Sequence, residues 1–137
     1  MSRLLIDTNI VIDLLSKRDK FYDEAADLFS RADKKELELT ISSLTFANTN
    51  YILSKLKSAK EAREILRKFK VLVELLSLDD KVTELALSDD NFPDFEDGLQ
   101  YYSAMENQID VIITRNKKDF KNSKIPVLTA KEFLARK

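Results

Sequence analysis

Acidic and amide side chains recur in three short stretches of the chain, each placed where an apolar run ends or a helical pattern begins. The stretches are LLIDTN at residues 4–9, PDFEDG at residues 93–98 and TRNKKDF at residues 114–120. Hard divalent cations such as Mg²⁺ take oxygen ligands and keep several waters, so a few carboxylates and a substrate phosphate complete their shell. Carboxylates that converge without a cation would repel one another. The three stretches are therefore candidates for one metal site.

The composition limits the chemistry that such a site can use. The 137 residues include no histidine and no cysteine, which excludes thiolate zinc sites, cysteine nucleophiles and bases built on imidazole. The length suits one domain, and we expect residues 1–137 to form it. No apolar run approaches the roughly 20 residues of a membrane span, and no signal-peptide pattern opens the chain. We expect a cytoplasmic protein that does not contact membranes.

The elements that must position the acidic residues follow from the periodicity. Apolar runs predict five strands, at residues 4–6, 37–41, 71–76, 111–114 and 127–128. Helical spacing predicts helices at residues 10–15, 22–29, 44–52, 62–69, 82–87 and 95–107. This alternation predicts an α/β three-layer sandwich, with a mainly parallel central sheet of about five strands covered by helices on both faces. In such sheets ligands bind beyond the carboxyl ends of the strands, where Asp7, Asn116 and Asp119 would lie.

Each acidic residue also has a purely structural interpretation. Asp7 alone is as well explained by capping the following helix as by metal ligation. Asp94 is best explained as a helix N-cap, and Glu96 and Asp97 would favour the positive end of the same helix. Asp119 would suit a turn. No single acid decides between structure and chemistry.

The charges are segregated along the chain although the formal net charge is only −1. Residues 55–70 contain seven basic and two acidic residues, residues 74–97 contain nine acidic and one basic, and residues 111–137 contain eight basic and two acidic. Solvated helix faces explain the first basic stretch most simply. The functional interpretation is a track for a phosphate backbone beside an acidic pocket.

Four stretches taken together in this order resemble a PIN domain, the fold of VapC-type toxins from toxin–antitoxin pairs. They are LLIDTNIVIDLL, TISSLTFANTNYIL, DFEDGLQYYSAMENQIDVIITRNKKDF and IPVLTAKEF. The resemblance covers essentially the whole chain, and its most specific part is the block from Asp97 to Asp119. It implies a PIN-like parallel sheet between helices and an endoribonuclease that hydrolyses RNA with Mg²⁺ or Mn²⁺.

The resemblance also implies roles for individual residues. Asp7, Asp97 and Asp119 match the acidic metal-site residues of the family, and Asn116 matches a polar residue that supports the catalytic site. Asn48 stands where the family usually has a glutamate, which leaves the activity in question. We expect the Asn48 side chain to point inward and to need a hydrogen-bond partner. Glu96 is a candidate for supplying the missing carboxylate as a metal ligand.

Further predictions concern the surroundings of the site and the partners. Asn9, Thr114 and Asn48 would support the site, and Arg115, Lys117 and Lys118 would bind the RNA backbone. Tyr101 and Tyr102 are better explained by core packing than by base stacking. The resemblance implies a small antitoxin and a homodimer.

Two other functions compete with the ribonuclease interpretation. One is a PIN-fold RNA- or protein-binding module with weakened cleavage, which Asn48 supports. The other is a phosphoacceptor receiver domain, which fits less well because a lone acid ends the first strand where such domains have paired acids.

Overall fold

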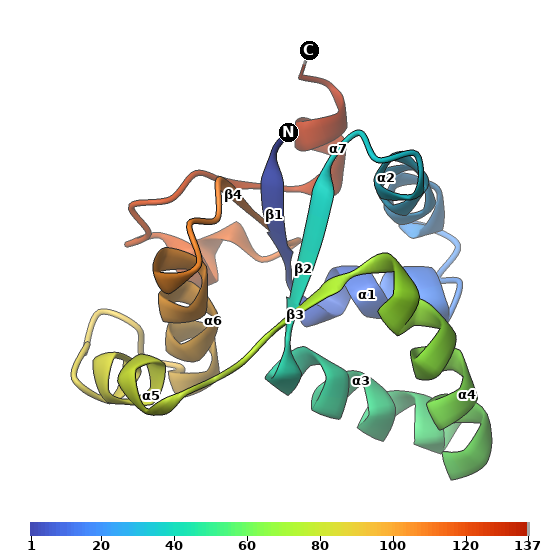
Figure 1. The fold of residues 1–137 in the computed structure, drawn as a ribbon, viewed down its shortest axis with the longest axis horizontal. Coiled ribbons are helices and arrows are strands. Elements are labelled where there is room, and N and C mark those ends of the chain that lie inside the picture. The colour runs from blue at the N-terminus through green and yellow to red at the C-terminus, as the bar shows by residue number, and fades with distance from the viewer. Residues whose placement is uncertain (137) are drawn as a thin grey trace.

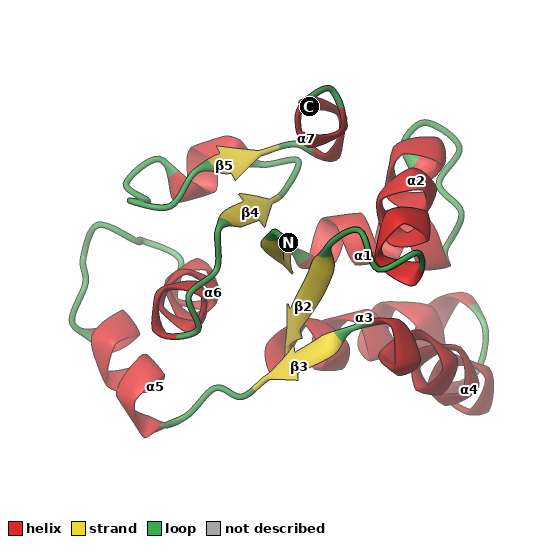
Figure 2. Cartoon of the chain, turned by 45° about the horizontal axis from the view of Figure 1, so that its top comes forward, coloured by secondary structure: helices red, strands yellow, loops and turns green. Residues whose placement is uncertain are grey.

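A parallel sheet forms the centre of the computed structural model, which describes residues 1–136. Its strands are β1 (Arg3–Ile6), β2 (Glu38–Ser42), β3 (Glu74–Leu76), β4 (Val111–Ile113) and β5 (Val127–Leu128). They lie in the order β3-β2-β1-β4-β5, and every neighbouring pair is parallel. Figure 2 shows β3 and β5 at the two edges of this twisted sheet. The predicted five-stranded parallel sheet is confirmed.

Helices connect the strands and cover both faces of the sheet (Figure 1). They are α1 (Thr8–Leu15), α2 (Tyr22–Asp33), α3 (Ser43–Leu56), α4 (Ala59–Phe69), α5 (Asp80–Leu87), α6 (Phe95–Glu106) and α7 (Ala130–Leu134), with 3₁₀ turns η1 (Lys70–Leu72) and η2 (Lys117–Phe120). Parallel strands need such crossovers, because the chain must return to the same end of the sheet before each new strand.

The two faces of the sheet have separate apolar cores because successive side chains of a strand point to opposite sides. Leu4 and Ile6 of β1 pack in a large cluster with residues of α1, α2, α3, α4 and α7. Leu5 of β1 and Ile112 of β4 pack on the other side, in a cluster with α6 and η2. The strands at the centre are therefore buried on both faces, as their continuous apolar runs predict.

Apart from shifts of a few residues at the ends of elements, one predicted strand and one helix differ from the prediction. Residues 71–76 are not one strand, because Val71 and Leu72 belong to η1 and the strand begins at Glu74. Val71 is 85% exposed, so its apolar side chain marks no core position. The short helix α7 was not predicted, although the capping box formed by Thr129 and Glu132 marks its start. None of the helices within residues 1–136 is both long and apolar enough to cross a membrane.

Candidate active site

Asp7 lies at the carboxyl end of the central strand and begins α1. Its backbone N–H donates to the Ile113 carbonyl at the end of β4 (3.0 Å), which brings the ends of the two strands together. Its Oδ1 accepts from the Thr8 N–H at 2.8 Å, so Asp7 is the N-cap of α1. Its Oδ2 accepts from the Thr114 hydroxyl at 2.8 Å and from the Asn9 amide at 3.4 Å. The capping interpretation is correct, and Asn9 and Thr114 contact the residue that they were predicted to support.

The hydrogen bonds of the Asp7 carboxylate come from neutral groups. A fourth donor is the Gln100 amide on α6, whose Nε2 lies 3.3 Å from Oδ1. Burial raises the pKa of Asp7, and the nearby charge of Asp119 adds to the rise, while these hydrogen bonds oppose it. The structure holds a half-buried carboxylate that has no cationic side chain among its hydrogen-bond donors.

The first turn of α6 brings further acidic residues to the same place. Asp94 is the N-cap of α6, as predicted, because its Oδ1 accepts from the Glu96 N–H at 2.8 Å. Burial raises the pKa of Asp97 to about 7, and the negative charges of Asp94, Asp119, Asp7 and Glu96 contribute in that order. Carboxylates from three separate chain segments thus raise the pKa of Asp97.

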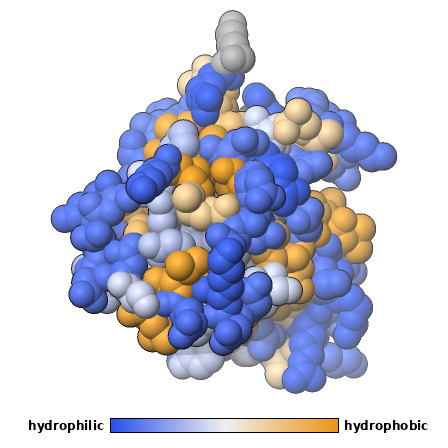
Figure 3. All heavy atoms as spheres, turned by 60° about the vertical axis from the view of Figure 1, so that its left-hand side comes forward, coloured by the Kyte–Doolittle hydropathy of each residue, from blue (hydrophilic) through white to orange (hydrophobic). Residues whose placement is uncertain are grey.

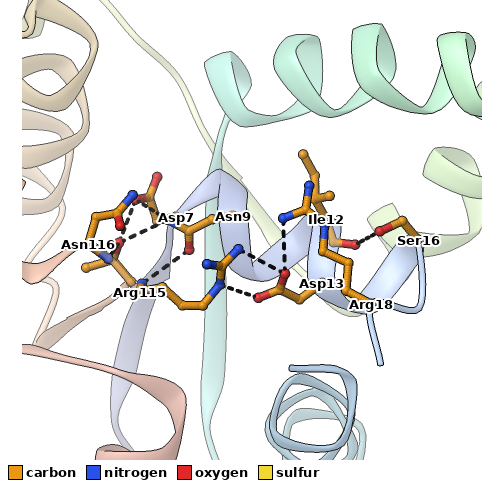
Figure 4. Close-up of polar contacts among 9 residues, drawn as sticks. Asp7, Asn9, Ile12, Asp13, Ser16, Arg18, Arg115 and Asn116 are labelled. Atoms are coloured by element: carbon orange, nitrogen blue, oxygen red, sulfur yellow. Dashed lines mark hydrogen bonds and ion pairs between the residues drawn. The ribbon is translucent and has the colours of Figure 1, made fainter. Parts of the chain in front are cut away.

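The segment after β4 supplies the third part of the site. The Asn116 N–H donates to the Thr114 hydroxyl at 3.1 Å, and Asp119 lies within η2. Figure 4 shows Asp7, Asn9 and Asn116 side by side at the start of α1. The end of β4 therefore places amide and carboxylate groups beside Asp7.

These groups line a pocket of about 340 Å³ at the carboxyl ends of the strands, which we call the acidic pocket. Its lining residues are Asp7, Thr8, Asn9, Ile12, Arg18, Leu44, Asn48, Ile52, Asp94, Glu96, Asp97, Gln100, Asn116 and Asp119. The structure thus brings together the acidic residues of three stretches that are distant in the sequence. Thr114, which is fully buried, supports the pocket from behind through its bond to Asp7.

The donor set of the acidic pocket fits a hard divalent cation. Within residues 1–136, no three acidic side chains approach closely enough to form a ready-made metal cage. Mg²⁺ does not need one, because it keeps several waters and uses one or two carboxylates with substrate phosphate. The Gln100 Oε1 atom is buried and has no hydrogen-bond partner, which leaves an oxygen acceptor unsatisfied beside Asp7. Asp7, Asp97 and Asp119 could hold such an ion together with water.

Asn48 finds its partner across the pocket. Its Nδ2 donates to the Glu96 Oε1 at 3.0 Å, joining α3 to the first turn of α6. Asn48 is half-buried and lines the acidic pocket, so the predicted inward orientation is correct. The structure therefore places the Glu96 carboxylate beside Asn48.

Two of the three predicted RNA-binding residues have other partners. Arg115 does not line the acidic pocket; its Nε and Nη2 donate to the buried Asp13 at 2.8 and 3.2 Å, and its guanidinium lies 4.1 Å from the Phe21 ring centre. Lys117 forms an ion pair with Glu132 at 2.9 Å. Lys118 is exposed beside Asp119.

The two tyrosines belong to the interior rather than to an exposed stacking surface. Tyr101 is 4% exposed and stacks on Phe92, with ring centres 4.7 Å apart. The Tyr102 hydroxyl donates to Asp89 at 2.6 Å. The core-packing interpretation is confirmed for Tyr101, and Tyr102 packs against the same aromatic group.

Three residues of this region were missed from the sequence. Gln100 carries no charge, yet its position one helical turn after Asp97 was a signal that it shares a face with that residue. Arg18 is the one basic residue among those that line the acidic pocket. Asp13 reads as an ordinary helix residue, and nothing in its spacing shows that it is fully buried.

Known proteins share the sequence pattern and the fold of this chain. Residues 3–118 match the family model of the PIN domain. The chain is 27% identical to Ribonuclease VapC1 of Aquifex aeolicus, over 98% of this chain and 94% of that protein. It is also similar to the structure of DNA-bound VapBC from Salmonella typhimurium (TM-score 0.73, 17% identity, 95% of this chain and 99% of that one).

A second structure, VapBC2 from Rickettsia felis bound to a DNA fragment from its promoter, gives a TM-score of 0.68 at 23% identity and covers 92% of this chain and 96% of that one. At such identities the structural matches show the fold. The family match spans residues 3–118, which excludes the alternative of a phosphoacceptor receiver domain. The chain belongs to the PIN domain family.

Proposed function

We propose that this protein is a metal-dependent endoribonuclease and the toxin of a toxin–antitoxin pair. One observation carries the proposal: Asp7, Asp97 and Asp119 come from three distant segments and line one pocket at the ends of β1 and β4. The similarity to Ribonuclease VapC1 over nearly the full length of both chains supports it.

Asp7, Asp97 and Asp119 would hold Mg²⁺ or Mn²⁺ in the acidic pocket. A bound ion of this kind lowers the pKa of a coordinated water and neutralises charge on the scissile phosphate. No imidazole is present to share this work, because the chain contains no histidine. The protein's part is to present carboxylates in a fixed orientation.

The neutral donors around Asp7 supply that orientation. Thr8, Thr114 and Gln100 hold both carboxylate oxygens from three directions. Since neutral donors leave the negative charge of Asp7 uncompensated, a cation is favoured there more than beside a salt-bridged carboxylate. The pKa of Asp97, about 7, means that a bound cation would also shift this group toward its charged form.

Asn116, Asn48 and Glu96 have supporting roles in the proposal. Asn116 lies beside Asp7 and offers an amide to water or to RNA. The bond between Asn48 and Glu96 fixes the Glu96 carboxylate on the wall of the pocket, so Glu96 is the residue that could replace the glutamate usual in the family. Lys118 is the candidate for contact with the RNA backbone that has no ion pair in the described part of the chain.

The second candidate function is a binding module with weakened cleavage. The observation that favours it is Asn48, whose amide brings no negative charge to a wall of the acidic pocket. Such a module would bind RNA or a protein with the same surface and release no product.

An antitoxin and a second copy of the chain are the proposed protein partners. A toxin–antitoxin complex from Klebsiella pneumoniae is similar in fold to this chain, with a TM-score of 0.69 at 24% identity over 93% of this chain and 97% of that one. Large apolar side chains are exposed on α3, η1, α5 and α6, among them Tyr51, Val71, Leu87 and Phe95. Figure 3 views the side that carries α5 and α6 and shows hydrophobic atoms in separate patches between hydrophilic ones. Light scattering of the isolated chain and of its complex tests both partners.

Cleavage of a mixed-sequence RNA distinguishes the two functions. Purified protein should cleave with Mg²⁺ or Mn²⁺ and stop when EDTA is added, and Asp97→Asn and Asp119→Asn should be inactive although folded. RNA binding without cleavage by wild-type protein in every metal tested would instead favour the binding module.

A further inference from the structure

The buried Asp13 holds two arginines that lie at two different pockets. Arg115 makes the close contacts described above and lines a pocket with Phe21 between α1, α2 and the start of α7. Arg18 approaches the Asp13 Oδ1 from the other side, with its Nη1 at 3.5 Å, and lines the acidic pocket. Figure 4 shows the two guanidinium groups on different sides of the same carboxylate. Asp13 therefore links the loop after β4 to the rim of the acidic pocket.

The backbone of Arg18 is fixed on both sides. Its N–H donates to the Asp13 carbonyl at 3.2 Å, and its own carbonyl accepts from Phe21 at 3.0 Å and Tyr22 at 2.8 Å. The residue thus closes the turn that ends α1 and begins α2. Its side chain starts from a defined point although it is 45% exposed.

Most of the hydrogen-bonding capacity of the Arg18 guanidinium is unused in the described part of the chain. It makes one long contact with Asp13, whose two oxygens are already engaged at shorter distance by Arg115. A guanidinium carries five N–H donors in a planar fork that matches phosphate. Arg18 can therefore keep its contact with Asp13 and still donate to a ligand.

The charges around Arg18 indicate which kind of ligand its free donors could bind. The acidic pocket is lined by five carboxylates, and Arg18 is the one cation among its lining residues. A polyanion that enters such a pocket is repelled by the carboxylates, and a fixed cation at the rim offsets part of this repulsion.

We propose that Arg18 binds a backbone phosphate of the RNA at the rim of the acidic pocket, and that Asp13 positions its guanidinium. The proposal rests on the ribonuclease function proposed above and adds a substrate-binding residue to it. The competing explanation is that Arg18 only helps to neutralise Asp13, which would make it a stability residue.

Kinetics and binding of Arg18→Gln separate these explanations. Cleavage of a mixed-sequence single-stranded RNA gives kcat and KM, and fluorescence anisotropy with the same labelled RNA in an Asp97→Asn background gives Kd at several KCl concentrations. Lys20→Gln is the matched control, because it removes the same charge from an exposed residue two positions away that does not line the acidic pocket. Arg18→Lys keeps the charge and loses the planar fork.

We expect Arg18→Gln to raise both KM and Kd about tenfold, the usual effect of losing a hydrogen bond to a charged group. The slope of log Kd against log salt should fall by about 0.7, corresponding to one phosphate contact on a single strand. Arg18→Lys should recover part of the affinity, and Lys20→Gln should match wild type. The melting temperature of Arg18→Gln should stay close to that of Lys20→Gln.

Other results would overturn the proposal. If Arg18→Gln melts earlier but keeps the KM, the Kd and the salt slope of Lys20→Gln, Arg18 acts on stability alone. In that case cleavage by wild type and its loss in Asp7→Asn would still leave the ribonuclease function standing. If wild-type protein cleaves no RNA, the proposed function fails, and the anisotropy measurement alone decides whether Arg18 contacts phosphate.

Discussion

Two aspartates of the same segment, the half-buried Asp7 and the fully buried Asp13, have opposite surroundings. Asp13 is fully buried and bound by Arg115, with Arg18 as a second counter-ion. Asp7 accepts hydrogen bonds from neutral groups and faces the charges of Asp97 and Asp119. Arginines neutralise the Asp13 carboxylate, while the Asp7 carboxylate has no cationic partner within residues 1–136.

The surroundings of an aspartate therefore distinguish a structural role from a chemical one more clearly than its residue type does. A buried carboxylate with a cationic partner stabilises a particular packing of its neighbours, here the loop after β4 against α1. A buried carboxylate among other carboxylates has a raised pKa and weakens the folded state unless a cation binds. In the proposed function, the acidic pocket therefore lowers the stability of the folded protein until a cation binds.

Substitution of Asp13 should give the largest effect on stability. Asp13→Ala should lower the free energy of unfolding by about 3 kcal/mol, the lower end for a broken buried ion pair because Arg115 keeps some contact with solvent. Asp7→Asn should leave stability at pH 7 unchanged or raise it, since it removes a carboxylate that burial disfavours. Urea unfolding of both variants measures the contrast, with the exposed Asp33→Asn as the control. Equal losses from Asp7→Asn and Asp13→Ala would show that the two aspartates do not differ in this way.

A divalent cation should stabilise the protein through the acidic pocket. At a Mn²⁺ concentration about 100-fold above its Kd, linkage predicts about 2.7 kcal/mol of added stability. Asp97→Asn should lose most of this gain, while Asp33→Asn should keep it. Thermal unfolding with and without Mn²⁺ makes the measurement. A gain of the same size in Asp97→Asn would place the cation elsewhere.

The raised pKa of Asp97 should also change how the free energy of unfolding depends on pH. Its pKa is about 7 in the folded protein and 3.8 in an unperturbed chain, so the folded state binds the proton more tightly than the unfolded state. Without metal, this group therefore lowers the free energy of unfolding progressively as pH rises from about 4 to about 7. Asp97→Asn should be less sensitive to pH in that window, as measured by urea unfolding at a series of pH values. Identical profiles for the two proteins would contradict the raised pKa.

The contact between Asn48 and Glu96 should give the smallest change. Glu96→Gln should lower kcat about fivefold if its carboxylate substitutes for the missing glutamate, which corresponds to about 1 kcal/mol of transition-state stabilisation. Asn48→Ala should lower kcat less, because it loosens Glu96 without removing it. Steady-state cleavage assays give both values. Undiminished cleavage by Glu96→Gln would remove this residue from the site.

The fold was largely predictable because buried parallel strands appear in the sequence as continuous apolar runs. The edge strand β3 was harder to predict. Val71 and Leu72 extend its apolar run in the sequence, although Val71 lies on the surface in a 3₁₀ turn. Periodicity reports which side chains are apolar, and an exposed apolar side chain carries the same signal as a buried one.

The convergence of the acidic residues followed from the rule that parallel strands end at one edge of the sheet. The ion pair of Arg115 could not be predicted from the sequence, because its partner Asp13 lies 102 positions away. The two residues meet only because α1 packs against the loop after β4. Arg18 and Gln100 were missed for the same reason, since their importance lies in what they face across the pocket.

The RNA cleavage rate of Asp7→Asn in Mn²⁺, measured beside wild type and Asp33→Asn, tests most directly whether the acidic pocket is the catalytic site. We expect Asp7→Asn to fold as stably as wild type and to lose cleavage by at least about a hundredfold. Asp33→Asn should cleave at the wild-type rate, and EDTA should stop both active proteins. Cleavage by folded Asp7→Asn at the wild-type rate would contradict the assignment of the acidic pocket as the catalytic site.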